Sequence, residues 1–265
     1  MEGASPGKTL KNILSTVAPA LSLVLLMYIW VGASSVNSEL VPSPPMVWSR
    51  FMQTFARPIS GRLIFGHILA SLQRIGVALL FSTTLGIAFG TMIGWNKTLN
   101  AIFGTLFELL RPIPPIAWMP LVVMWFGIGE FPKVLLVFIG TYTPIVVNTA
   151  TGIRLIDPLN LDVGRMFNAN GRQLLLEIAL PSALPAIFAG FRTATSGALM
   201  VVLAAEMIGA RAGLGFLITR GMESFDVPLI LVGMLVIAFV GTCISLFTDL
   251  LEKVVCPWNR KLQLD

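Results

Sequence analysis

Four charged residues lie within or at the edges of strongly apolar segments, and they are the side chains best placed for chemistry in this chain. Glu108 and Arg111 are three residues apart, so they share a helical face and could form an ion pair. Arg192 and Glu206 are fourteen residues apart, close to four helical turns, and also share a face. A charge at the centre of a membrane helix costs about 2.5–3.5 kcal/mol, so such groups tend to face a bundle interior or a solute pathway. Two interpretations stay open for Arg192 and Glu206, an interfacial structural role and a place along a pathway.

The segment from Arg111 to Pro120 contains four prolines, Pro112, Pro114, Pro115 and Pro120. Proline removes a backbone donor and interrupts a helix. Backbone groups freed at membrane depth are tolerated only beside protein or a water-filled cavity. This segment is therefore the best candidate for a pathway wall, and its candidate residues are Arg111, Pro114, Pro115 and Trp118.

Other familiar site patterns are incomplete. The segment Gly3–Thr9 resembles a phosphate-binding loop, but it has three residues instead of four before Gly-Lys-Thr and no preceding strand. His67 is the only histidine and has no cysteine nearby, so we expect no metal site at it. We also expect no Ser/His/Asp set around it. Cys243 and Cys256 match no metal or disulfide spacing. We expect no enzyme activity, no metal and no nucleotide or other cofactor bound by this chain.

Composition places these residues in a membrane protein. Of 265 residues, 55% are hydrophobic and only 12% are charged, against about 25% in soluble domains. The mean hydropathy is +0.85, and the apolar residues form runs of the length that crosses a bilayer as a helix. The net charge of +5 suits loops facing anionic membrane lipid. No dense basic patch with interleaved aromatic residues is present, so nucleic acid is not an expected partner.

The apolar runs predict an all-α integral membrane protein with about six transmembrane helices. Residues 17–36 are too long for a signal-peptide core and lack a cleavage site, so they are interpreted as an anchor. Gly86, Gly90 and Gly94 recur every fourth residue, which predicts close approach of another helix. The expected spans are Ile13–Val36, Ile68–Trp95, Ile102–Phe126, Val134–Ile153, Ala183–Ile208 and Pro228–Leu251.

Loop charge favours cytoplasmic N- and C-termini, with nine basic residues on the cytoplasmic side against six outside. We divide the chain into an N-terminal tail, first helix and external linker (1–62), a core transmembrane domain (63–252) and a cytoplasmic tail (253–265). The core domain includes a polar loop, residues 154–181, which this orientation places in the cytoplasm.

That loop carries the most informative pattern. Pro158 after Asp157 is typical of a helix start, and apolar residues from Leu159 to Phe167 cluster on one side of a short amphipathic helix. Asn168, Asn170 and Gly171 then supply turn chemistry, and a second short helix is expected to end at Leu180-Pro181. Two short helices projecting from a membrane domain suggest a plug for a groove in another protein. A surface loop without a partner fits the pattern equally well.

The loop resembles the E-A-A-x-x-x-G coupling loop of ABC-importer permeases, which ends in I-x-L-P. In this sequence the pattern falls on Asp162, Val163, Gly164 and Asn168, and it closes on Ile178-Ala-Leu180-Pro181. Further stretches resemble the nitrate, sulfonate and taurine permeases of the type I ABC importers. They are Leu72-Gln-Arg74, Glu108–Leu121, Trp125–Gly129, Leu180–Pro185, Gly190-Phe-Arg192, Ala204-Ala-Glu206 and Gly213-Leu-Gly215.

The resemblance implies a permease fold, a second permease copy, cytoplasmic ATP-binding subunits that hold ATP and Mg, and an external solute-binding protein. It assigns coupling to residues of the loop, namely Asp162, Val163, Gly164, Phe167, Asn168, Ala169, Gly171, Leu180 and Pro181. The implied solute is a small anion such as taurine or another sulfonate, nitrate or bicarbonate. The alternative is a self-sufficient secondary transporter or channel, which predicts inverted repeats. No clear repeat relates residues 1–130 to 131–265.

Overall fold

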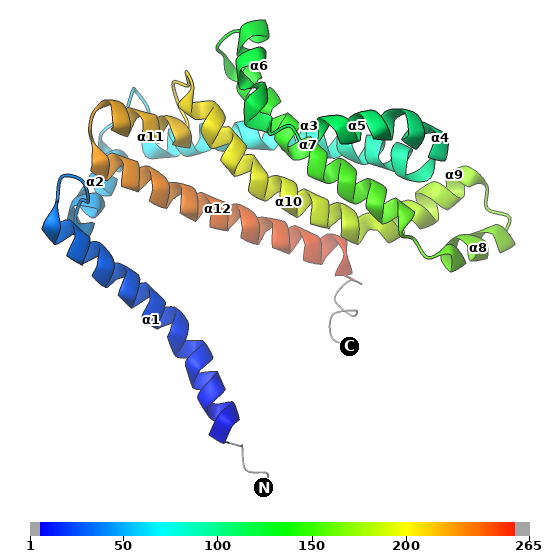
Figure 1. The fold of residues 1–265 in the computed structure, drawn as a ribbon, viewed down its shortest axis with the longest axis horizontal. Helices are drawn as coiled ribbons and strands as arrows, with labels where there is room; N and C mark the ends of the chain where they lie inside the picture. Colours follow the sequence, from blue (N-terminus) through cyan, green and yellow to red (C-terminus); the bar gives the residue numbers. More distant parts are fainter. Residues whose placement is uncertain (1–5, 258–265) are drawn as a thin grey trace.

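The computed structural model describes residues 6–257, and the regular elements among them are all helical (Figure 1). The long helices are α1 (Pro6–Val36), α3 (Ile64–Trp95), α7 (Glu130–Arg154), α10 (Leu180–Met207) and α12 (Val227–Val255). The shorter ones are α2 (Pro44–Ala56), α4 (Lys97–Leu99), α5 (Thr105–Leu110), α6 (Met119–Phe126), α8 (Pro158–Met166), α9 (Gly171–Gln173) and α11 (Leu214–Glu223). Two π-helical segments, η1 (Asn100–Gly104) and η3 (Leu174–Ala179), and one 3-10 segment, η2 (Pro115–Trp118), complete the set.

Helices α3, α7 and α10 form the centre of the bundle, and α12 packs along α10 (Figure 1). The predicted glycine ladder lies between α3 and α7. Gly90 faces Thr149 and the Val146 carbonyl of α7, and a β-carbon on Gly90 would come within 2.7–2.8 Å of both. Gly86 and Gly94 face Ile145 and Ala150 in the same way. The prediction of close helix approach along this face is confirmed.

A β-branched residue at Gly90 is expected to push these helices apart. Gly90→Val should lower the free energy of unfolding by about 1–3 kcal/mol, the usual cost of overpacking, as measured by denaturant unfolding in detergent micelles. Gly76 lies on the same helix with open space around its α-carbon, so Gly76→Ala serves as the control. A Gly90→Val protein as stable as the control would contradict close packing of α3 on α7.

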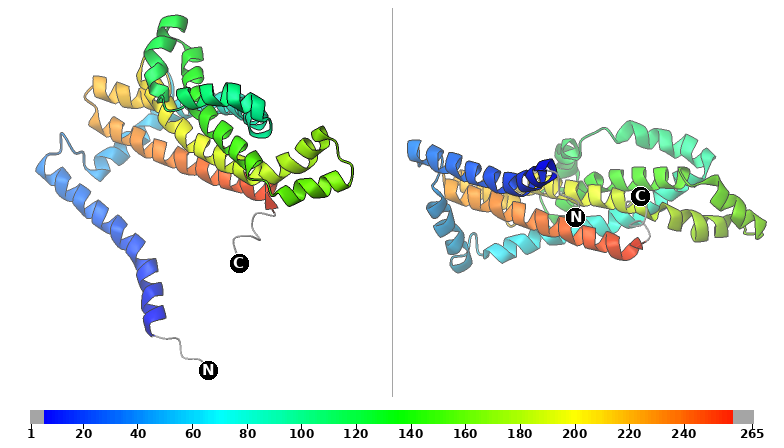
Figure 2. Two further views of the ribbon diagram at one scale, coloured as in Figure 1. Left: turned by 45° about the vertical axis from the view of Figure 1, so that its right-hand side comes forward. Right: turned by 90° about the horizontal axis from the view of Figure 1, so that it is seen from below.

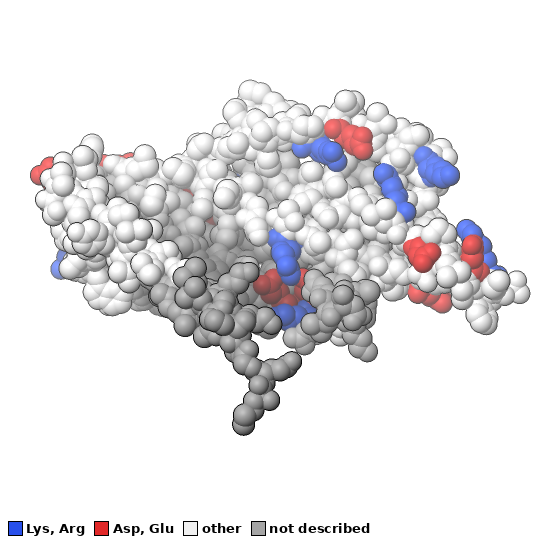
Figure 3. Space-filling model, turned by 60° about the horizontal axis from the view of Figure 1, so that its bottom comes forward, with Lys and Arg blue, Asp and Glu red and all other residues white. Residues whose placement is uncertain are grey.

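Within residues 6–257, four helices are long and apolar enough to cross a membrane, and a bent pair can supply a fifth span. The bent pair runs from Lys97 to Leu110 and from Pro115 to Phe126, with an angle of 86° between its halves. Helix α1 adds the apolar stretch Leu21–Val36. These six elements correspond to the six expected spans. On the face seen in Figure 3, charged side chains are sparse and gather mostly toward one end, as expected for a body surrounded by lipid.

The structure departs from the expected fifth span. Helix continues without interruption from Gly171 to Met207, so the predicted end at Leu180-Pro181 is wrong. The π-helical turn η3 explains the continuity. Leu180 N–H bonds the Leu175 carbonyl, and Pro181 follows as the second residue of α10, where the missing N–H of proline is tolerated.

Helices α1 and α2 form a peripheral arm. Figures 1 and 2 show α1 diverging from the bundle, and its side chains from Leu21 to Ile29 are exposed. Helix α2 is too short to span a bilayer and lies at the end of the bundle where α3 and α12 begin. The sequence interpretation treated α2 as a polar linker. The loop resembling a phosphate-binding loop begins outside the described residues.

Candidate functional site

The start of helix α8 is fixed by its N-cap, and its position against the neighbouring helix is fixed by one buried glycine. Asp157 accepts a hydrogen bond from Leu159 N at 2.9 Å, and Pro158 occupies the first turn, as the sequence predicts. Gly164 is buried against Leu174 and Ile178 of η3, where a β-carbon would overlap both side chains. Gly164 therefore lets α8 lie directly on the helix that continues into α10.

The opposite face of α8 is apolar and exposed. Met166 and Phe167 are 84% and 83% exposed, and Leu159 and Val163 are also exposed. Asp162 pairs with Arg165 at 2.7 Å on the surface. Figure 2 shows α8 and α9 projecting together from one end of the bundle. An exposed apolar face on a rigid projection fits a groove in another protein.

The turn after α8 is fixed by its backbone. Asn168 has φ 55°, the left-handed conformation that asparagine tolerates, and it lies in the turn that the sequence predicts here. Ala169 N donates to the Gly164 carbonyl at 3.1 Å and closes the turn. Asn170 and Gln173 then form a reciprocal capping box with two bonds of 2.9 Å at the start of α9, while Gly171 is exposed.

Leu180 and Pro181, the last residues assigned to the coupling loop, lie at the start of α10 next to η3. Leu180 packs at the edge of the cluster formed by Ile153, Ala179 and Ala183. The structure thus places the set from Asp162 to Gly171 on one projecting unit and Leu180 and Pro181 at the start of α10, where the helix from that unit enters the bundle. This unit is connected to α7 on one side and to α10 on the other.

The proline-rich segment interrupts a span as expected. Helix α5 ends at Leu110, and Arg111 is exposed with no ion pair to any described residue, including Glu108. Pro114 precedes the 3-10 turn Pro115–Trp118. Pro115 lies against Gly140 of α7, and Trp118 packs beside the cluster of Met119, Val122, Leu136 and Ala205.

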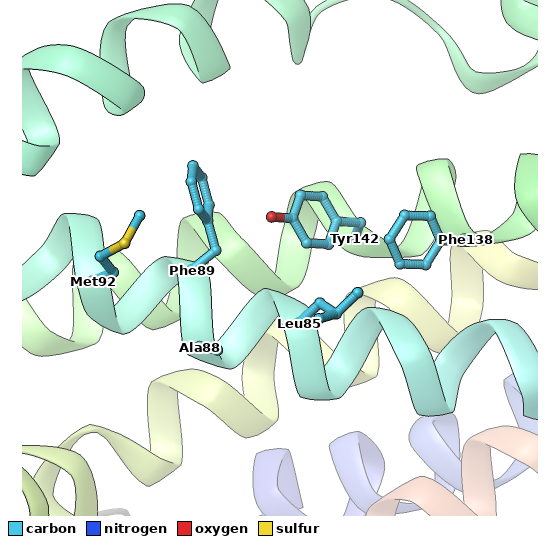
Figure 4. A pocket seen from close by; sticks show the side chains of 6 residues that line it. All are labelled: Leu85, Ala88, Phe89, Met92, Phe138 and Tyr142. Atoms are coloured by element: carbon cyan, nitrogen blue, oxygen red, sulfur yellow. The ribbon is translucent and has the colours of Figure 1, made fainter.

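An aromatic pocket of about 580 Å³ lies beside the broken span, along the seam of α3 and α7 (Figure 4). Phe89, Phe138 and Tyr142 supply its rings, and Leu85, Ala88 and Met92 complete the lining. The ring of Phe107 in α5 lies beside the rings of Phe89 and Tyr142, with distances of 5.8 and 6.3 Å between ring centroids. The Tyr142 ring lies among apolar side chains, so its hydroxyl is the one polar side-chain group in this lining.

Arg192 and Glu206 lie at different positions along α10 and make different contacts. Arg192 is half exposed and pairs with Asp249 at 3.1 Å and with Glu252 of α12. These pairs tie the C-terminal end of α12 to the middle of α10. Because both partners are acidic side chains of this chain, the Arg192 charge already has a structural role.

Glu206 is fully buried near the opposite end of α10. Its carboxylate accepts hydrogen bonds from Ser71 at 2.7 and 2.9 Å, from Arg74 at 2.6 Å and from Gly215 N at 2.9 Å. A β-carbon on Gly213 would overlap the carboxylate. Glu206 therefore joins α3, α10 and the start of α11 in one satisfied polar cluster.

Arg74 is the residue that sequence reasoning missed. It is 5% exposed and also holds Glu130 of α7 through two bonds of 2.7 and 2.9 Å. On the same face of α3, His67 Nδ1 accepts a hydrogen bond from Gly213 N, and Ser71 Oγ accepts one from Leu214 N. The sequence does contain an indication of this pair, because Arg74 and Glu206 are opposite charges in two apolar spans and such charges tend to pair.

His67 has a structural role. Its Nε2 lies 3.1 Å from the Ile59 carbonyl, and its ring stacks on Phe216. Across residues 6–257, no group of three or more His, Cys, Asp or Glu side chains could hold a metal.

Known proteins share this sequence and this fold. Residues 82–261 match the family of binding-protein-dependent transport system inner membrane components. The taurine transport system permease protein of Escherichia coli is 31% identical over 91% of this chain and 90% of its own length. A putative aliphatic sulfonates transport permease protein of Escherichia coli is 32% identical, covering 96% of each chain. The nitrate import permease protein of Synechocystis is 29% identical, covering 92% of this chain and 91% of its own.

Solved structures support the same fold. A chain of the inward-facing MetNI methionine ABC transporter aligns with a TM-score of 0.63, 17% identity, 80% coverage of this chain and 99% of its own. The family match spans most of the bundle, from α3 to the end of α12. The chain belongs to the family of binding-protein-dependent transport system inner membrane components, as a multi-pass inner-membrane permease of the type I ABC importer class.

Proposed function

We propose that this chain forms the translocation pathway for a small anionic solute and couples it to ATP hydrolysis in separate cytoplasmic subunits. The observation that carries the proposal is α8, a capped helix that projects from the bundle and exposes its apolar face. Burial of such side chains in a groove of a partner is favourable, at about 25 cal/mol per Å² of apolar surface. The site residues of this unit are Asp162, Val163, Gly164, Phe167, Asn168, Ala169, Gly171, Leu180 and Pro181.

The proposed partners are two ATP-binding subunits that carry ATP and Mg, a second copy of the permease and an external solute-binding protein. Family membership supports the first and last of these. Broad exposed apolar surface on α5 and α6, including Leu109, Met124 and Trp125, is consistent with a permease dimer or with lipid. Closure of the ATPases would move the two α8 helices together and open the pathway outward.

The proposed orientation places both termini and α8 in the cytoplasm. Basic residues near the span ends on the α8 side support it, among them Lys97, Arg154, Arg165 and Arg172. The opposite end then faces outward, with Glu130, the Gly209–Gly215 turn and α2.

The solute class rests on the relatives named for taurine, aliphatic sulfonates and nitrate. Bicarbonate belongs to the same class of small anions. Arg111 is an exposed cation at the break between the two halves of the bent span, and with Pro114, Pro115 and Trp118 it forms the proposed pathway wall. Arg192 and Glu206 are engaged in ion pairs within this chain, so we propose that they support the pathway helices.

The test is uptake into vesicles that contain the permease, its ATPase subunits and its solute-binding protein. Uptake of taurine, nitrate or bicarbonate should require ATP and the binding protein, and dissipating ion gradients should leave it intact. Uptake that persists without ATP and follows an ion gradient would support a secondary transporter or channel instead.

A further inference from the structure

The turn between α11 and α12 holds a phenylalanine in a backbone conformation that bulky residues rarely adopt. Phe225 has φ 53°, and its side chain is 92% exposed. The left-handed conformation is unfavourable for it, because the β-carbon then lies too close to the following carbonyl oxygen. Exposure of the ring also gives up the free energy that burial of an aromatic side chain supplies. The coupling and pathway assignments leave this residue without a role.

The hydrogen bonds of this turn are those of a Schellman motif. Asp226 N donates to the Gly221 carbonyl at 2.8 Å, and Phe225 N donates to the Met222 carbonyl at 3.2 Å. The left-handed position in this motif is usually glycine and sometimes asparagine, which adopt positive φ at little cost. Phe225 therefore occupies a position that normally excludes its residue type.

Helix α8 ends in the same motif and provides a comparison within the chain. Ala169 N donates to the Gly164 carbonyl at 3.1 Å, and Asn168 N donates to the Arg165 carbonyl at 2.9 Å. Asn168 occupies the left-handed position there, as the motif prefers. Backbone preference accounts for the residue type at the end of α8, whereas it does not account for Phe225.

The turn around Phe225 is held on both sides. Ser224 donates its hydroxyl to the Arg220 carbonyl at 2.7 Å, which closes the end of α11. Asp226 caps the start of α12 and pairs with Arg50 of α2 at 2.7 Å. These contacts fix the backbone on which the exposed ring is carried.

The surroundings of the ring are polar and lie at the outer end of the bundle. Arg220 and Glu223, in the last turn of α11, have side chains that are 50% and 60% exposed. Figure 1 shows this turn at the end of the bundle away from α8, the end that the proposed orientation turns outward. An exposed aromatic side chain beside exposed charges resembles the centre and rim of a protein interface.

We propose that Phe225 is an anchor for the external solute-binding protein. The inference rests on the proposed function, which includes this partner, and the family description, binding-protein-dependent, supports its class. A folded partner has a pocket in one place, so its binding gains from a ring on a backbone already fixed. A lipid surface is fluid and accepts a ring in many directions, so an unfavourable fixed backbone brings no such gain there.

The test compares two variants that suit the turn and remove the ring, Phe225→Gly and Phe225→Asn. Affinity is measured by biolayer interferometry between the permease–ATPase complex in nanodiscs and the purified solute-binding protein of the same importer. An aromatic anchor at an interface typically contributes enough that both variants should lose roughly thirtyfold in affinity. Both should also unfold at a temperature no lower than the unaltered complex, because glycine and asparagine relieve the left-handed backbone. Loss of affinity with unchanged or higher stability is a result that a structural role cannot give.

Two matched variants serve as controls. Phe225→Tyr keeps the ring and should keep most of the affinity, and Phe247→Ala removes an exposed ring within the α12 span and should change nothing. Unchanged affinity in Phe225→Gly and Phe225→Asn would overturn the proposal. If both variants instead became less stable in nanodiscs and bound the partner normally, the ring would be a lipid anchor, which also overturns it. Failure of the unaltered complex to bind the solute-binding protein would contradict the proposed function itself, so the two failures are distinguishable.

Discussion

Replacing Phe167 with alanine is expected to release the ATPase subunits from a permease that still folds and inserts. Phe167 is 83% exposed at the end of α8, so its loss removes no contact within the bundle. A buried aromatic anchor at an interface typically contributes about 2 kcal/mol or more, which corresponds to roughly a thirtyfold loss of affinity. Co-purification of the ATPase with the variant, together with vesicle uptake, measures this effect.

A change in the turn at Asn168, next to Phe167, is also expected to release the ATPase subunits. Asn168 has φ 55°, a conformation that a β-branched residue resists, so Asn168→Val should displace the end of α8 without touching the apolar face. Ser38→Ala, in the segment between α1 and α2, is the matched control and should change nothing. Normal ATPase association and uptake in both α8 variants would exclude α8 as the coupling element.

Breaking the buried cluster around Arg74 is expected to have the largest effect on stability. Arg74→Met leaves the Glu206 carboxylate buried with only Ser71 and Gly215 N as partners, and it also releases Glu130. Removal of one member of a buried pair usually costs about 3–5 kcal/mol. The free energy of unfolding in detergent micelles should fall by that amount.

Removing both charges distinguishes the cost of leaving a buried charge unpaired from the cost of altered packing. The double variant R74M/E206M should recover most of the loss, because no buried charge then lacks its partner. Arg220→Gln, which breaks an exposed pair, should cost under about 1 kcal/mol. If Arg74→Met were no more destabilising than Arg220→Gln, Arg74 would not hold the ends of α3, α7 and α10 together.

Local patterns in the sequence were enough to predict the parts of the site that depend on neighbours in the chain. Pro158 after Asp157 located the start of α8, and Asn168 indicated the left-handed turn, because both depend on backbone preferences of single residues. The ladder of Gly86, Gly90 and Gly94 predicted a close helix contact for the same kind of reason. The identity of the helix in contact, α7, required the structure.

Features that depend on distant residues were missed or misjudged. The partner of Glu206 is Arg74, 132 residues away, and periodicity within one helix carries no information about it. The helix end predicted at Leu180-Pro181 failed because a π-turn in η3 accommodates the proline. Helix α2 was hidden because its prolines and polar residues resemble those of a linker, although Pro44 and Pro45 stand at its first turn, where proline is favoured.

The most direct test of the account is site-specific cross-linking from α8 to the ATPase. Met166→Cys, 84% exposed, in a background where Cys243 and Cys256 are replaced by alanine, supplies one thiol on the apolar face. A short thiol-to-amine cross-linker added to the assembled complex should join this position to the ATPase subunit, with a yield that changes when ATP is bound. Ile128→Cys, exposed at the opposite end of the bundle, should give no such product. Absence of a cross-link from position 166, or an equal yield from position 128, would contradict coupling through α8.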